Sequence, residues 1–274
     1  MIIWLASYPK SGNTWVRLFL DFYINNHSNI NNLKINQFPQ KIYTKDLIKD
    51  FSSVKEFSVN CNLAQTIINM DNKIKFFKTH NSYWSVQNHK FTDETNTLGV
   101  IHIVRDPRNV ITSLQNHYDI KDSEKALNFI TNKNKFISNS KNENEIMHVI
   151  SSWSNHYRSW KKFKKNYLLV KYEDLLTDPK KEFERILRYL NKIANIKFDT
   201  SKFNYTLNNT KFDNLKKKEN QNGFKELLNN DSLIKKNFFH LGPNNNWRQR
   251  LELNIINKIE DEFKDEMIEL KYLN

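Results

Sequence analysis

Short apolar runs recur along the chain and predict buried β-strands. They lie at residues 2–6, 75–78, 99–104 and 167–172. Between them, apolar side chains spaced three and four positions apart predict amphipathic helices. These helices are expected from residue 14 onward, over 58–70 (through Val59, Leu63, Ile67 and Met70), over 109–118 and 145–165, from 178–179 onward, and over 251–270. Because strands that alternate with helices favour a parallel sheet, we predict a three-layer α/β fold with a central parallel sheet of four to five strands flanked by helices.

Three stretches carry a weaker pattern. Residues 25–50 are polar and rich in Asn, which predicts an irregular connection that forms part of a binding-site wall. Residues 119–145 combine polar composition with one weak helical pattern and are interpreted as a mobile lid or insertion. The pattern also loosens over 191–239. No linker rich in Pro, Gly or Ser divides the chain, so a single domain over 1–274 is expected.

Residues 7–17 join the first predicted strand to the first predicted helix through a loop suited to an anion. The free backbone N–H groups and the positive end of the helix dipole meet there, and Lys10, Ser11 and Thr14 add side-chain donors. The loop is P-loop-like, but it is not a Walker loop, because Lys10 precedes Gly12 instead of following a second Gly. The alternative is an ordinary connection that happens to contain Lys and Gly.

Charged side chains also follow two other predicted strands. His80 comes after the strand at 75–78, and Arg105 comes after the strand at 99–104. In open α/β sheets, ligands bind outside the carboxyl ends of the strands. We therefore expect Lys10, His80 and Arg105 to face one crevice.

Composition narrows the class of partner only partly. The formal net charge of +13 favours anionic partners, but nucleotides, nucleic acid, acidic glycans and membrane surfaces all qualify. The single cysteine, Cys61, excludes an internal disulfide and favours a reducing, cytoplasmic location. The apolar start is too short for a signal peptide, and no stretch reaches a membrane-spanning length.

Several segments together resemble the sulfotransferase family. Residues 9–15, Pro-Lys-Ser-Gly-Asn-Thr-Trp, resemble the family's phosphosulfate loop PKSGTTW, with Asn13 in place of Thr. Residues 77–80 resemble its Lys-Thr-His segment, and residues 104–113 resemble its 3′-phosphate motif, an Arg after a strand and a Ser eight positions later. Residues 171–175 and 210–213 resemble two further segments that contact the nucleotide base.

The resemblance implies a role for each matching residue. His80 would be the catalytic base, with Lys10 and Lys78 as the cations that stabilise the transferred group. The donor, 3′-phosphoadenosine-5′-phosphosulfate, would be bound by a set of residues that includes Lys10. The other members of that set are Ser11, Gly12, Asn13, Thr14, Trp15, Arg105, Ser113, Tyr172, Phe212 and Gly242.

Each of these side chains also has a structural alternative. His80 could be a hydrogen-bonded structural histidine, and the aromatics could belong to the core. Arg105 could form a surface pair with Asp106, and Arg108 is interpreted as a surface or helix-start charge without a family role.

The resemblance weakens near the carboxyl terminus. Gly242 and Trp247 match a family segment that completes the phosphate site, but His240 and Leu241 replace its Arg and Lys, and Asn245 replaces a Gly. Donor affinity is therefore expected to be lower unless a nearby basic side chain compensates. The candidates are Arg248 and Arg250.

Taken together, the sequence predicts a sulfotransferase that moves a sulfuryl group to an acceptor hydroxyl or amine in line, without a metal, and releases adenosine 3′,5′-bisphosphate. The acceptor is expected to be a small molecule, glycan or lipid, bound by residues 25–50, Tyr83, Trp84 and residues 119–145; neither nucleic-acid binding nor membrane insertion is expected. Two alternatives remain: a P-loop kinase, which needs Mg²⁺ and a carboxylate to hold it, and a non-catalytic protein that binds anions or glycans. The sequence does not reveal the oligomeric state.

Overall fold

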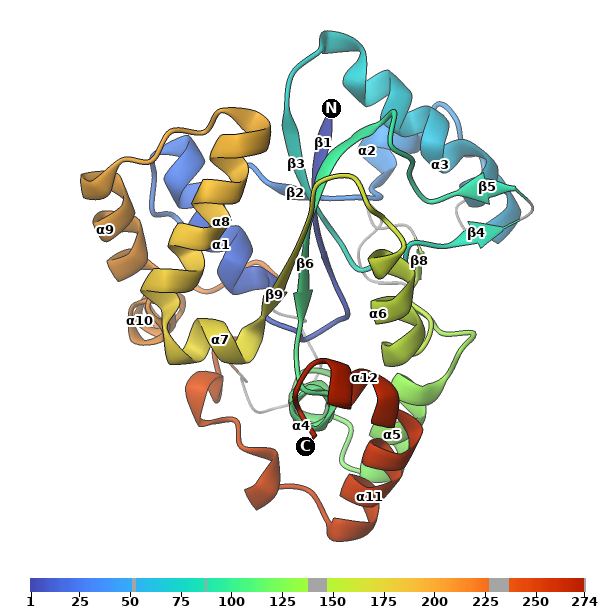
Figure 1. Cartoon of the computed structure of the whole chain (residues 1–274), viewed down its shortest axis with the longest axis vertical. Coiled ribbons are helices and arrows are strands. Elements are labelled where there is room, and N and C mark those ends of the chain that lie inside the picture. Colours follow the sequence, from blue (N-terminus) through green and yellow to red (C-terminus); the bar gives the residue numbers. More distant parts are fainter. Residues whose placement is uncertain (51–52, 87, 138–146, 227–236, 274) are drawn as a thin grey trace.

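A five-stranded parallel sheet forms the centre of the molecule (Figure 1). The computed structural model describes residues 1–50, 53–86, 88–137, 147–226 and 237–273. Across the sheet the strands run in the order β2 (Asn36–Gln37), β3 (Lys75–Thr79), β1 (Ile2–Ser7), β6 (Thr97–Val104), β9 (Tyr167–Lys171). The predicted parallel α/β sheet is confirmed. The fifth strand, β2, lies within the stretch that was predicted to be irregular. It was missed because two residues are too few to show a periodic pattern.

Helices cover both faces of the sheet and one end of it. In Figure 1, α1, α8 and α9 lie on one side of the strands, while α3 and α6 lie on the other. Their bounds are α1 Asn13–Asn25, α3 Val54–Ile68, α6 Trp153–Lys161, α8 Pro179–Ala194 and α9 Thr200–Asn209. At the carboxyl ends of the strands lie α4 (Pro107–Tyr118), α5 (Ser123–Thr131), α11 (Leu253–Glu262) and α12 (Lys264–Glu269).

The remaining elements are short. They are α2 (Lys41–Thr44), α7 (Tyr172–Thr177), α10 (Phe212–Asn222), the 3₁₀ turns η1 (Asn69–Asp71), η2 (Gly242–Asn244) and η3 (Trp247–Gln249), and the hairpins β4 (Ser85–Val86) with β5 (His89–Lys90) and β7 (Phe136–Ile137) with β8 (His148–Val149).

Strand β1 organises the core, because it is buried on both faces. Ile3 and Leu5 pack into the cluster formed with α1 and α8, whereas Ile2 and Trp4 pack into the cluster formed with α3 and α6. Alternate residues of a strand point to opposite faces, so six residues anchor two layers of helices at once. The loop that follows β1 therefore starts from the most rigid part of the molecule.

The helix expected over 58–70 exists, but its predicted buried face is wrong. Val59, Leu63 and Ile67 are 42%, 47% and 47% exposed, and Met70 is 75% exposed. The helix instead buries Phe57, Cys61 and Ala64 against the sheet. The helix carries two apolar stripes, and the packing against the sheet buries the one that contains Phe57.

The helix expected over 145–165 is wrong at its beginning. His148 and Val149 form the hairpin strand β8, and Ser152 caps α6 by accepting a hydrogen bond from the backbone N–H of Asn155. An N-cap side chain that satisfies a free N–H fixes the start of a helix. Residues 145 and 146 lie outside the described part of the chain.

The single helix expected over 251–270 is divided into α11 and α12 at Phe263. Phe263 is fully buried and packs on Trp153, with its ring centroid 5.1 Å away. The break turns the chain so that Ile259 and Met267, on either side of it, reach the same core cluster.

The weakly patterned stretches 119–145 and 191–239 also contain helices. Within 119–145, α5 buries Ala126, Leu127 and Ile130 against α4 and α11, so a mobile lid or insertion is wrong for residues 123–131. Residues 138–145 of that prediction lie outside the described residues. Within 191–239, α9 and α10 form around few buried apolar anchors, and such short helices leave little periodicity to detect.

The two faces of α3 predict contrasting costs of truncation. Phe57→Ala should reduce the free energy of unfolding by about 3–5 kcal/mol, because a fully buried ring leaves a cavity. Leu63→Ala on the exposed face should change it by less than about 1 kcal/mol. Urea denaturation of both variants measures the difference, and equal losses would show that the exposed stripe is packed in solution.

Candidate functional site

One cavity of about 1320 Å³ lies at the carboxyl ends of the central strands and gathers nearly all of the predicted site residues. Lys10, His80 and Arg105 all line it, as expected from their places after β1, β3 and β6. Ser11 is fully buried beneath the loop. The other predicted residues in the lining are Gly12, Asn13, Thr14, Trp15, Lys78, Ser113, Tyr172, Phe212 and Gly242.

The loop after β1 makes two left-handed backbone turns. Lys10 has φ 64° and Gly12 has φ 95°. At Gly12 a Cβ atom would lie 2.3 Å from the Tyr172 ring, so neither the backbone angle nor the space admits a side chain. Helix α1 then begins without a side-chain cap, which leaves its first N–H groups available to an anion.

Asn13 fastens this loop to β1. Its Nδ2 donates to the carbonyl of Leu5 at 2.9 Å and to Ser7 Oγ at 3.1 Å. The side-chain amide is therefore engaged within the protein, and the backbone N–H at the start of α1 is the donor that this position can offer to an anion.

Arg105 joins the loop to the strand that carries it. Its Nη1 donates to the carbonyl of Lys10 at 2.9 Å, and its guanidinium carbon lies 4.3 Å from the centre of the Tyr172 ring. Three buried donors at the site have no partner among the described residues: Ser11 Oγ, Trp15 Nε1 and Arg105 Nε. Because buried polar groups are nearly always hydrogen-bonded, these orphaned donors fit a site that is completed by a polar ligand.

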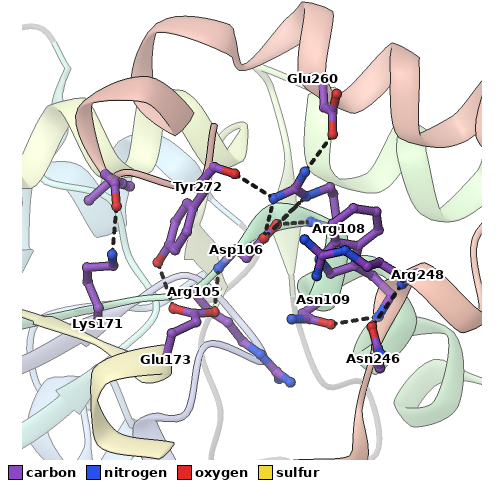
Figure 2. Close-up of polar contacts among 12 residues, drawn as sticks. Arg105, Asp106, Arg108, Asn109, Lys171, Glu173, Asn246, Arg248, Glu260 and Tyr272 are labelled. Atoms are coloured by element: carbon purple, nitrogen blue, oxygen red, sulfur yellow. Dashed lines mark hydrogen bonds and ion pairs between the residues drawn. The ribbon is translucent and has the colours of Figure 1, made fainter. Parts of the chain in front are cut away.

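The turn that follows Arg105 is held by a buried polar network (Figure 2). Glu173 accepts from the backbone N–H of Asp106 at 3.0 Å and from the hydroxyl of Tyr272 at 2.8 Å. Arg108 bridges the Asp106 carboxylate and the carbonyl of Tyr272. This network ties the turn between β6 and α4 to the segment after α12 and supports the position of Arg105.

The structure decides between the alternatives for these charges. Arg108 stands at the start of α4, as predicted, but it is 4% exposed and lies across the Trp247 ring at 4.0 Å, so it is not a surface charge. Asp106 gives its carboxylate to Arg108, not to Arg105, so a surface Arg105–Asp106 pair does not form. The carboxylate neutralises the buried guanidinium of Arg108, and this leaves Arg105 to face the cavity.

Aromatic rings and glycines pair at two places in the cavity. The Tyr172 ring lies against Gly12, and the Phe212 ring lies against Gly242, where an added Cβ would come within 2.1 Å of the ring. Trp15 meets Tyr172 edge to face, with the ring centroids 6.1 Å apart. Large flat rings that line a cavity suit the stacking of a planar base.

The altered carboxyl-terminal segment lies on the same cavity. His240, Leu241 and Asn245 line it, and Asn245 is anchored to α4 through Thr112 and the carbonyl of Asn109. The two candidates for a compensating charge, Arg248 and Arg250, are exposed and do not contribute to the lining. Neither candidate can therefore replace the missing Arg and Lys, and, apart from the predicted cations, the Lys and Arg side chains that line the cavity are Arg17, Lys211 and Lys225.

The tautomer of His80 follows from its partner. His80 Nδ1 lies 2.9 Å from the carbonyl oxygen of Ser7, which can only accept, so Nδ1 carries the proton and Nε2 keeps its lone pair. Burial, with a further contribution from Lys78, lowers the pKa of His80 well below its usual value. The ring is thus neutral at pH 7 and has one nitrogen free to accept a proton.

His148 and Gln37 were not identified from the sequence. Asn81 Oδ1 accepts from Val149 N and Trp84 Nε1, so Asn81 Nδ2 must donate to His148 Nδ1 at 3.1 Å. The proton of the neutral His148 ring then lies on Nε2, 3.0 Å from Gln37 Nε2, so the Gln37 amide must exchange its oxygen and nitrogen and accept this N–H through Oε1. A lone His within a predicted helix and a Gln in a polar stretch carry no signal of this pairing.

Arg17, His117 and Glu226 were also missed, although all three line the cavity. Arg17 lies one helical turn after Thr14, so its spacing could have placed it beside the loop. Burial together with Lys10 and Lys78 lowers the pKa of His117 to about 3, so this ring is neutral at pH 7. Glu226 is separated from its partner Arg17 by 209 positions, and no local pattern connects them.

The expected acceptor wall is partly wrong. Trp84 is 8% exposed and packs on Phe57 and Phe91, and Tyr83 packs on Trp160; neither lines the cavity. The polar stretch 25–50 does contribute to the lining. Its members there are Ile30, Asn31, Leu33, Asn36, Gln37 and Gln40.

Comparison with known proteins identifies a family. The chain matches the model described as "Sulfotransferase domain" over residues 2–271. Sulfotransferase 1B1 of the dog, Canis lupus familiaris, is 26% identical over 215 residues, which are 70% of this chain and 59% of that protein. Human sulfotransferase 2A1 is 23% identical over an alignment of 280 residues, which covers 97% of this chain and 84% of that protein. The matched region is thus less than two thirds of the dog relative's length.

Two solved structures share the fold. Mouse sulfotransferase SULT7A1 complexed with PAP superimposes with a TM-score of 0.62 at 20% identity, covering 97% of this chain and 84% of that chain. Retinol dehydratase in complex with androsterone and the inactive cofactor PAP gives a TM-score of 0.59 at 15% identity, covering 97% and 80%. In the described part of this chain, no helix is both long enough and apolar enough to span a bilayer.

The charge of Lys10 predicts how anion affinity depends on pH. Burial, Lys78 and Arg105 lower the pKa of Lys10 to about 7, and a bound anion would raise it again. Sulfate affinity should therefore be constant below about pH 7 and fall up to ~10-fold per pH unit above it. Sulfate itself does not titrate in this range, so calorimetric titration from about pH 6 to 9 isolates the protein group.

Lys10→Arg provides the control, because a guanidinium stays protonated throughout this range. Its profile should be flat. An equally flat profile for the unmodified protein would show that Lys10 keeps an ordinary pKa.

Proposed function

The chain belongs to the sulfotransferase domain family, and we propose that it transfers a sulfuryl group from 3′-phosphoadenosine-5′-phosphosulfate to an acceptor hydroxyl or amine. One observation carries the proposal. The anion loop at the start of α1, the Arg105 guanidinium and the neutral ring of His80 all face the same cavity. Relatives crystallised with PAP support the choice of donor.

The donor would lie along the row of residues that the cavity brings together. The loop N–H groups and Lys10 would bind the 5′ phosphosulfate, while Arg105 and Ser113 would bind the 3′ phosphate. Tyr172, Phe212 and Trp15 would enclose the adenine. The rings of Tyr172 and Phe212 offer flat surfaces on which the base can stack, and Trp15 Nε1 offers a hydrogen-bond donor.

In the proposed reaction, His80 Nε2 accepts the proton of the acceptor hydroxyl as its oxygen attacks sulfur. The new oxygen–sulfur bond forms as the bond between sulfur and the bridging phosphate oxygen breaks, and adenosine 3′,5′-bisphosphate leaves. Lys10 and Lys78 stabilise the charge that develops on the transferred group and on the leaving phosphate. No step in this proposal requires a metal.

The stretch 25–50 lines the cavity with polar and apolar side chains. Asn36, Gln37 and Gln40 offer hydrogen bonds to hydroxyl groups, and Ile30 and Leu33 offer apolar contact, so a small molecule, glycan or lipid that carries a hydroxyl would fit. A cytoplasmic location is part of the same proposal and rests on the single free cysteine, Cys61.

The neutral tautomer of His80 favours catalysis over the alternative of a non-catalytic binding protein, which would not need a free ring nitrogen beside two cations. The kinase alternative is disfavoured by the loop, in which Lys10 precedes Gly12.

Donor identity predicts which nucleotide stabilises the protein. Adenosine 3′,5′-bisphosphate should raise the midpoint of thermal unfolding, because it binds only the folded state. ATP with Mg²⁺ should raise it far less, since it lacks the 3′ phosphate that Arg105 and Ser113 would bind. Stabilisation by ATP with Mg²⁺ alone would favour the kinase.

Loss of the base predicts a separate effect on turnover. His80→Ala should reduce transfer from labelled donor to a panel of hydroxyl acceptors by about 10²–10⁴-fold, with bisphosphate binding unchanged. His89→Ala, outside the cavity lining, is the control. Unchanged turnover in the His80 variant would exclude it as the base.

A further inference from the structure

A carboxylate lies among the cations of the proposed phosphosulfate site. Glu226 forms an ion pair with Arg17, and its Oε2 is 3.8 Å from the Nζ of Lys78. Lys78, Arg17 and Lys10 together hold the pKa of Glu226 down to about 2, against the opposing effect of burial. Glu226 is therefore charged at every pH at which the protein would work.

The backbone that carries this carboxylate is anchored. Asn31 donates to the carbonyl of Gly223 at 3.0 Å and accepts from the N–H of Lys225 at 2.9 Å. Phe224, between them, is 6% exposed and packs in a cluster with Phe22 and Leu215. The segment that leads from α10 to Glu226 is thus fixed at its side chains and its backbone.

The partner of Glu226 is fixed as well. Arg17 is 4% exposed, and its Nε donates to the carbonyl of Ile35 at 2.6 Å, which orients the guanidinium toward the carboxylate. An anion bound at Lys78 would have to share these cations with Glu226. Two negative charges in a confined site of low dielectric repel strongly, so one of them must leave.

We propose that Glu226 excludes small anions: its carboxylate occupies the place of the donor's sulfuryl end and must be displaced before an anion binds. The identification of that anion as a sulfuryl group rests on the function proposed above. The carboxylate imposes the same penalty on every anion that binds at Lys78.

An equal penalty leaves the ratio of the affinities unchanged, but it lowers a weak affinity below the level at which the anion fills the site. Inorganic sulfate or phosphate reaches only the cations near the loop, so the penalty removes most of its affinity. The nucleotide donor gains further contacts from Arg105, Ser113 and the aromatic rings, which offset the loss. Glu226 would thus keep abundant small anions out of a strongly basic cavity while admitting the donor.

The test compares two matched ion pairs. Glu226→Gln removes a carboxylate whose side chain is 29% exposed and whose Arg partner is 5% exposed. Glu260→Gln removes a carboxylate that is 28% exposed from Arg108, which is also 5% exposed, and Glu260 does not line the cavity. Arg108 keeps its second carboxylate partner, Asp106, in this control.

Binding of inorganic sulfate and of adenosine 3′,5′-bisphosphate is measured by calorimetry for all three proteins. The titrations are made near pH 6, below the pKa of about 7 of Lys10, because Glu226 helps to keep that lysine protonated. Glu226→Gln should lower the dissociation constant for sulfate by ~10-fold, whereas Glu260→Gln should leave it unchanged. If the Gln variant does not fold, Glu226→Asp, which keeps the charge but retracts it from Lys78, should give a smaller gain in the same direction.

The outcomes separate this inference from the proposed function. Sulfate affinity that is unchanged or weaker in Glu226→Gln overturns the inference and identifies Glu226 as a counter-ion that organises Lys78 and Arg17. Failure of the unmodified protein to bind the bisphosphate overturns the proposed donor but not the sulfate result. An equal gain in Glu260→Gln would show a general effect of net charge and would also overturn the role of Glu226.

Discussion

The fold brings several cations together in one buried cavity, and the repulsion between them is the main constraint on the site. Lys10, Lys78 and Arg105 arrive there from the ends of three parallel strands, and their proximity, together with burial, brings the pKa of Lys10 down to about 7. Such an arrangement is unfavourable unless negative charge balances it. Glu226 supplies part of that balance within the protein, and a polyanionic donor would supply the rest.

Backbone carbonyls and amides, not only charges, prepare the site for chemistry. The carbonyl of Ser7 fixes the proton of His80 on Nδ1, and Asn13 holds the same stretch of β1 through Leu5 and Ser7 Oγ. The loop, the His80 ring and the central strand are therefore held together as one unit. Because β1 is buried on both faces, this unit is held where packing tolerates the least movement.

Much of the fold could be read from periodicity, and the errors have a common cause. Four strands and the main helices lie where apolar spacing placed them, because a buried parallel strand and an amphipathic helix each impose a pattern on the sequence. The pattern failed on α3, where two apolar stripes competed, and at Phe263, where a buried ring breaks one continuous pattern into two helices. In both cases the neighbours in the fold made the choice.

The sequence by itself determined the candidate residues whose meeting depends on local order: the loop around Gly12, the Lys and His at the end of β3, the Arg before α4 and the Ser within it. Short-range geometry dictates these spacings, so a motif can record them. Only the tertiary structure decided the partners of those residues. Glu226 meets Arg17 across 209 positions, and His148 meets Asn81 across 67, because long-range packing brings them together and leaves no periodic trace in the chain.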